Sequence, residues 1–176
     1  MSNSILVTYA TRYNATREVA EKIAGVLSEH GLEVVVLPVQ NMRSLEGYRA
    51  VVLGAPLYIG SLLKGAQRFL EQHQAALVQL PAAFFALGPT RPGELDQPDV
   101  RAQLDEALAK IPWFKPVSAQ LFGGKYDPAR LRFPDSLLAA LPASPLHNQP
   151  ASDARDWNAI NAWAESLIEQ LQPAAA

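Results

Sequence analysis

The sequence predicts one α/β domain, in which a parallel β-sheet is covered by helices on both faces. Short apolar runs rich in β-branched residues alternate with segments of helical periodicity along the 176 residues. Strand–helix alternation of this kind is typical of a parallel sheet with helical crossovers. The length suits one domain, spanning 1–176, with a sizeable hydrophobic core.

The first half of the chain is expected to form three strands and two helices. The strands are 5–8, 33–38 and 50–54, because each is short, apolar and bounded by polar or turn-forming residues. A helix is predicted over 16–30, where apolar residues recur at helical spacing between Glu and Lys. A second helix is predicted around 62–70.

The second half continues the same alternation. Strands are predicted over 82–87 and 116–122, and helices over 99–111 and from Trp157 to Leu171. Ser152 or Asp153 is expected to cap the last helix.

A long segment at about 123–154 interrupts this alternation. It is rich in Pro, Gly and small apolar residues, and it is far longer than a usual connection. Loops of this length are either functional lids or disordered segments, and the sequence leaves both readings open. Its apolar piece Leu137–Leu141 could pack on a membrane, on a partner or on the protein's own core.

Composition excludes several classes of function. The formal net charge of −2 gives no strong field toward nucleic acid, so no nucleic-acid partner is expected. The absence of cysteine excludes disulfides, thiol nucleophiles and cysteine-ligated clusters. The histidines His30, His73 and His147 are isolated, so no metal site is expected. The N-terminus has neither a charged leader nor a long apolar run, which favours a cytoplasmic protein.

The loop after the first strand is the best candidate for an anion site. A tight turn between a buried strand and a helix N-terminus presents free backbone N–H groups and a positive dipole end. Thr11 and Thr16 could add hydroxyl donors, Arg12 could add charge, and Asn14 tolerates a left-handed conformation. The simpler interpretation is that Asn14 or Thr16 caps the helix. The glycine patterns of Rossmann and P-loop nucleotide sites are absent.

This loop resembles that of the flavodoxin family, in which a sequence of the type S-T-T-G-N-T wraps the phosphate of FMN. Position by position, the matching residues here are Thr11, Arg12, Tyr13, Asn14, Ala15 and Thr16. Two of the four hydroxyl positions are lost, and Asn replaces Gly. The resemblance implies a flavodoxin-like three-layer sandwich with a five-stranded sheet of order 2-1-3-4-5. It also implies that FMN is the cofactor.

Two further loops would then contact the flavin ring. The residues expected from the loop after the third strand are Pro56, Leu57, Tyr58, Ile59 and Gly60, and those from the loop after the fourth are Gly88, Pro89 and Thr90. Small residues allow close approach of a planar ring, and Tyr58 offers a face for stacking. The second loop holds no aromatic residue, so one ring face could be open to a substrate or partner.

The C-terminal run 153–157 is similar to the end of flavodoxin-like domains of the menaquinone-dependent protoporphyrinogen oxidase type, which also carry an extra segment before the last helix. The resemblance implies a small FMN-dependent oxidoreductase that passes electrons to a quinone-like or protein acceptor. No side chain is expected to be catalytic, because the flavin carries the chemistry.

Two alternatives stay open. A soluble flavodoxin-type electron carrier would use strong acidity for steering, and a net charge of −2 supplies little of it. A binding or regulatory domain that has lost FMN is the other alternative, because the phosphate loop departs from the family pattern. The donor, the acceptor and any homo-oligomer are not defined by the sequence.

Overall fold

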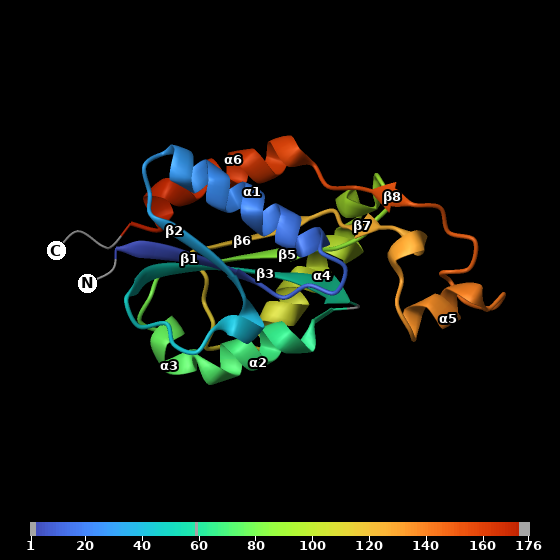
Figure 1. Ribbon diagram of the computed structural model, residues 1–176, viewed down its shortest axis with the longest axis horizontal. Coiled ribbons are helices and arrows are strands. Elements are labelled where there is room, and N and C mark those ends of the chain that lie inside the picture. Colours follow the sequence, from blue (N-terminus) through green and yellow to red (C-terminus); the bar gives the residue numbers. More distant parts are fainter. Residues whose placement is uncertain (1–2, 59, 173–176) are drawn as a thin grey trace.

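A five-stranded parallel sheet forms the middle layer of the protein, seen in a computed structural model that describes residues 3–58 and 60–172 (Figure 1). Its strands are β1 (Ser4–Tyr9), β2 (Val34–Pro38), β3 (Tyr48–Tyr58), β5 (Ala82–Leu87) and β6 (Ser118–Phe122). They lie in the order β2-β1-β3-β5-β6. Counted along the chain, this is the predicted order 2-1-3-4-5, which is confirmed.

Helices cover both faces of this sheet, as predicted. One face carries α1 (Ala15–Glu29) and α6 (Trp157–Gln170), and the opposite face carries α2 (Lys64–Gln72), α3 (Gln74–Leu77) and α4 (Pro98–Ala109) (Figure 1). Two short 3₁₀ turns, η1 (Val39–Asn41) and η2 (Glu94–Asp96), lie in the connections. No described helix is both long and apolar enough to cross a membrane.

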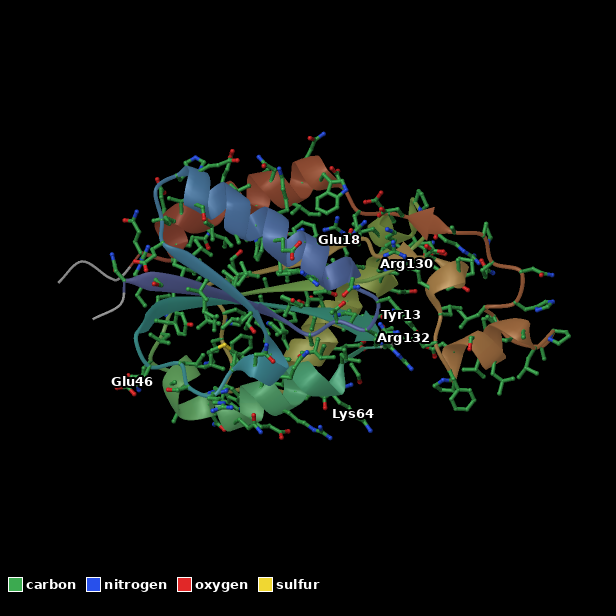
Figure 2. All side chains as sticks on the ribbon, in the orientation of Figure 1. Tyr13, Glu18, Glu46, Lys64, Arg130 and Arg132 are labelled. Carbon is green, nitrogen blue, oxygen red and sulfur yellow. The ribbon has the colours of Figure 1, made fainter. Side chains whose placement is uncertain are left out.

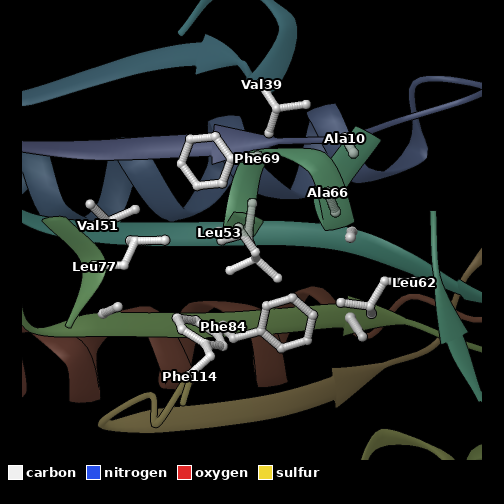
Figure 3. Close-up of a cluster of buried hydrophobic side chains, with 14 of the residues drawn as sticks. Ala10, Val39, Val51, Leu53, Leu62, Ala66, Phe69, Leu77, Phe84 and Phe114 are labelled. Carbon is white, nitrogen blue, oxygen red and sulfur yellow. The ribbon is translucent and has the colours of Figure 1, made fainter. Parts of the chain in front are cut away.

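Alternating side chains of the strands supply the two layers of the core. Ile5 and Val7 of β1 pack with α1 and α6, whereas Leu6 belongs to the cluster on the opposite face. Figure 3 shows this second cluster, which contains Leu53 of β3 and Phe69 of α2. The rings of Phe84 and Phe114 also pack together in it, edge to face. Successive side chains of a strand point to opposite faces of the sheet. Because both faces of β1 are covered by helices, every position along this strand is buried and its sequence is apolar almost throughout.

The third strand is longer than the sequence predicted. It continues past Gly54 to Tyr58, and β4 (Ser61–Leu62) then folds back antiparallel against Leu57 and Tyr58. Gly60 permits the reversal with a φ of 70°. The stretch expected to be a loop therefore forms the end of a central strand, because β5 pairs with it as far as Pro56 and Leu87.

The segment between β6 and α6 forms short elements beyond the carboxyl ends of the sheet (Figure 1). These are β7 (Lys125–Tyr126), η3 (Pro128–Arg130), α5 (Asp135–Ala140) and β8 (Ser152–Asp153), with β7 and β8 paired antiparallel. Leu137, Leu138 and Leu141 on and after α5 are exposed. The apolar piece of this segment therefore contributes little to the protein's own core.

Arg155 connects this segment to α1. Its Nε and Nη2 donate to the Asp153 carboxylate at 2.9 and 2.8 Å, and its Nη1 donates to Glu18 Oε2 at 2.7 Å. The Arg155 side chain is only 3% exposed, and its guanidinium lies 4.8 Å from the ring centroid of Trp157. Neither Ser152 nor Asp153 caps α6 as expected, because both lie in β8 before the helix begins and Asp153 is bound by Arg155. Asp156 caps it instead, accepting from the amides of Asn158 and Ala159.

Gly54 provides the first test of the packing. A Cβ at this position would overlap the ring of Phe85, which is fully buried. We expect Gly54→Ala to lower the free energy of unfolding by about 2 kcal/mol through overpacking. Gly25→Ala, on an open face of α1, should instead stabilise by about 0.5–1 kcal/mol. Urea unfolding would measure both, and adding Phe85→Leu should recover part of the Gly54→Ala loss.

Arg155 provides the second test. Arg155→Met leaves the Asp153 and Glu18 carboxylates without their buried cation, and we expect a loss of about 2 kcal/mol in unfolding free energy. Arg17→Met is the matched control, because the Arg17–Glu21 pair is exposed to solvent and its loss should change the unfolding free energy much less. Equal losses in the two variants would contradict the role given to Arg155.

The third test follows from the pKa of Asp153, which is lowered chiefly by the side-chain hydrogen bonds from Arg155. A carboxyl whose folded pKa is depressed contributes stability above its ordinary pKa near 4, and this is lost as the pH falls through the folded value. Asp153→Asn should therefore be less stable than the wild type at neutral pH, and the difference should shrink in acid. Urea midpoints measured from neutral to acid pH would show converging curves, whereas parallel curves would exclude this linkage.

Candidate functional site

A pocket of about 230 Å³ opens at the carboxyl ends of β1, β3 and β5. In the sheet, β2 lies on one side of β1, and β3 lies on its other side. The strand order therefore reverses at β1, and the pocket lies at this switch point of the sheet. Ten residues predicted to bind the cofactor line it: Thr11, Arg12, Tyr13, Ala15, Thr16, Pro56, Leu57, Tyr58, Gly88 and Thr90. The topology thus brings the three predicted loops together.

The other predicted residues are placed differently. Asn14 and Pro89 lie in the same loops but do not line the pocket. Gly60 lines a separate cavity between α2 and α4, where its carbonyl accepts a hydrogen bond from Lys110 Nζ at 2.9 Å. Ile59 lies outside the described residues.

One end of the pocket is built by the N-terminus of α1. Asn14 precedes the helix with a φ of 66°, the left-handed conformation that Asn tolerates, and its side chain makes no capping bond. The capping alternative is therefore not realised: Asn14 makes no such bond, and Thr16 lies inside the helix. Thr16 is 2% exposed and lines the pocket from the first helical turn. First-turn amides, a dipole end and threonine hydroxyls make this end suitable for an anion.

The segment before α6 closes over this end. Asp135 of α5 accepts a hydrogen bond from the Tyr13 hydroxyl and lies 3.1 Å from Arg12 Nη2. The backbone amide of Arg132 also donates to Tyr13 at 3.5 Å, and Figure 2 shows Tyr13 and Arg132 together beyond the sheet. Burial first, and then the hydrogen bond to Asp135, raises the pKa of Tyr13. The long segment is therefore docked on the first loop.

The opposite end of the pocket is apolar. Leu57 and Leu87 are buried in its wall, and Pro56 of β3 is paired with Leu87 of β5. Tyr58 is 46% exposed at the rim, and burial of the remaining part raises its pKa. Apolar walls with an aromatic residue at the rim suit a planar ring.

Residues of the long segment complete the lining, and the sequence did not identify them. They are Gly124, Lys125, Tyr126 and Leu146. The Gly124 amide donates to Pro89 O at 2.7 Å, and a Cβ on Gly124 would lie 2.6 Å from Gly88 O. The pair Gly123-Gly124 was the one available signal, because adjacent glycines allow such close backbone approach.

Comparisons with known proteins agree with this geometry. Residues 6–148 match the flavodoxin domain. The chain is 27% identical over 139 residues to the protoporphyrinogen IX dehydrogenase [quinone] of Escherichia coli K12, covering 77% of this chain and 76% of that protein.

Solved structures share the fold at low identity. Oxidised flavodoxin 1 from Bacillus cereus superposes with a TM-score of 0.62 at 17% identity, covering 97% of this chain and all of that one (100%). Rubredoxin oxygen:oxidoreductase from Desulfovibrio gigas superposes with a TM-score of 0.55 at 14% identity, covering 97% of this chain and 36% of that one. These likenesses show the fold alone. With the domain match over most of its length, the chain belongs to the flavodoxin family.

Proposed function

We propose that this protein binds FMN in the pocket at the ends of β1, β3 and β5 and is an oxidoreductase. The observation that carries the proposal is the pairing of an anion-binding loop with an apolar end in one pocket. FMN has the matching chemistry, with a phosphate at one end and a flat ring at the other. When bound, FMN supplies transfer of one or two electrons.

The residues present fit this group. Thr11 and Thr16 would donate to phosphate oxygens beside the first-turn amides of α1. Leu57 and Tyr58 would contact the ring, and the backbone at Gly88 to Thr90 would lie toward its polar edge. The pocket volume of about 230 Å³ is below the roughly 300–1,000 Å³ of pockets that enclose a whole small molecule. Part of the ring would therefore stay at the rim.

A quinone is the acceptor class that we propose. The Escherichia coli relative is named for a quinone, and it matches three quarters of both chains (77% and 76%). The loop at 88–90 places no aromatic side chain over the pocket, which leaves room for a small acceptor beside the ring.

An electron carrier is the second candidate. A carrier that docks on a charged protein should react more slowly as salt rises, because screening weakens steering. The net charge of −2 favours an enzyme acting on a small acceptor, for which the rate of reoxidation should change little with salt. Stopped-flow reoxidation of the reduced protein by a soluble quinone, across a salt series, separates the two.

The cofactor assignment is tested by titrating FMN and riboflavin into apo protein and following quenching of flavin fluorescence. Thr16→Ala should weaken FMN by about tenfold, the value of one hydrogen bond to a charged group, and leave riboflavin unchanged because riboflavin has no phosphate. Tyr58→Ala should weaken both flavins. Ser28→Ala, at the exposed far end of α1, is the control.

A wild-type protein that binds neither flavin would overturn the redox proposal and favour a binding domain that has lost FMN. A Thr16→Ala variant that weakens FMN and riboflavin equally would keep the cofactor but remove Thr16 from the phosphate site.

A further inference from the structure

We propose that Tyr126, on the short strand β7, donates its hydroxyl to the phosphate end of the bound cofactor. The inference rests on the proposed FMN site and adds to it a residue from the long segment. The first loop has Arg12 and Tyr13 where the family pattern has two threonines, so two of its four Ser and Thr hydroxyls are missing. The segment would supply one of them from the other side of the pocket.

The first observation is an unpaired buried hydroxyl. The Tyr126 oxygen is buried and has no hydrogen-bond partner within the part of the chain that the structure describes. A buried hydroxyl without a partner is costly, and a native protein normally satisfies it. Tyr126 is also one of the residues that line the pocket, and a ligand acceptor that reaches this oxygen would satisfy it.

The second observation is the place of Tyr126 along the pocket. Tyr126 and Lys125 also line a small adjoining cavity, together with Tyr13 and Ala15 of the first loop. They therefore lie at the anion end, away from Leu57 at the apolar end. Lys125 adds a positive charge on the same strand, and its charge contributes to the lowered pKa of Asp153. A phenol donor beside a cation suits a phosphate oxygen.

The third observation is that the backbone directly before β7 is held on both sides. The Gly124 amide donates to Pro89 O at 2.7 Å, and its carbonyl accepts from the Ala154 amide at 2.9 Å. A Cβ at Gly123 would overlap the Ala154 carbonyl, so this approach requires glycine. Tyr126 then pairs with Ser152 across the two-stranded sheet. A donor on such a fixed backbone is already placed for its ligand, which lowers the cost of binding.

The test is Tyr126→Phe, which removes the hydroxyl and keeps the ring. FMN affinity should fall by about tenfold, whereas riboflavin affinity should not change. Tyr48→Phe, at the opposite end of β3, is the matched control and should bind both flavins as the wild type does. The apo form of Tyr126→Phe should unfold at the same or a higher urea concentration, because the variant loses an unpaired hydroxyl.

The outcomes separate this inference from the proposed function. A wild-type protein that does not bind FMN would overturn both the proposed function and this inference. Unchanged FMN affinity in Tyr126→Phe, beside weakened FMN binding in Thr16→Ala, overturns the inference alone. Equal weakening of FMN and riboflavin would move Tyr126 away from the phosphate. A destabilised apo variant would mean that the hydroxyl already has a structural partner, and this also overturns the inference.

Discussion

The buried guanidinium of Arg155 is the interaction on which the shape of the site depends. It binds Glu18 in the first turn of α1 and Asp153 in β8, and it approaches the carbonyl of Ala15 at 3.4 Å. The first partner fixes the helix whose N-terminus forms the anion end of the pocket. The second fixes β8, which in turn pairs with β7. One buried cation therefore sets the distance between two walls of the pocket, although it does not line the pocket itself. Burial of a cation is tolerated here because two carboxylates and a carbonyl compensate its desolvation.

Electrostatics at the anion end are less simple than the loop sequence suggests. The sequence predicted that Arg12 adds positive charge for a phosphate, but its guanidinium is paired with Asp135. A phosphate in this loop would therefore meet a cation whose charge is already partly neutralised. Attraction must then come mainly from fixed donors, namely the first-turn amides of α1 and the threonine hydroxyls. Asp135 also holds Tyr13, so the same carboxylate that offsets Arg12 keeps the long segment closed over the loop.

The fold could be predicted from the sequence because β1 and β5 are buried throughout and β3 is buried over most of its length. The apolar runs of these strands are therefore continuous and easily distinguished from helical periodicity. The end of β3 could not, because Gly54, Ala55 and Pro56 have low intrinsic strand preference. They are extended because β1 and β5 pair on either side of them: Tyr9 is in register with Gly54, and Pro56 with Leu87. The cap of α6 was misassigned because the expected residues, Ser152 and Asp153, form β8 and pair with β7, and the helix begins only at Trp157, after Asp156.

The residues that line the pocket likewise include some that the sequence could predict and some that it could not. Its three main loops were predictable because parallel topology alone brings the carboxyl ends of β1, β3 and β5 together. Tyr126 was not predictable, since its position depends on backbone contacts between Gly124 and residues about 35 positions earlier, at Gly88 and Pro89.

The loop at 88–90 links these contacts to the chemistry of the site. Its backbone is bound to the end of β6, where the Gly88 amide donates to Phe122 O at 2.8 Å, and to β7 through Pro89. Pro89 restricts the backbone further, so this loop has little freedom to fold over a ring. It also carries no aromatic side chain that could cover one. A ring lying against the half-exposed Tyr58 would therefore keep part of its surface open. An open ring edge beside a rigid loop favours direct contact with a small acceptor, and in that case the field of a strongly charged surface is unnecessary for recognition.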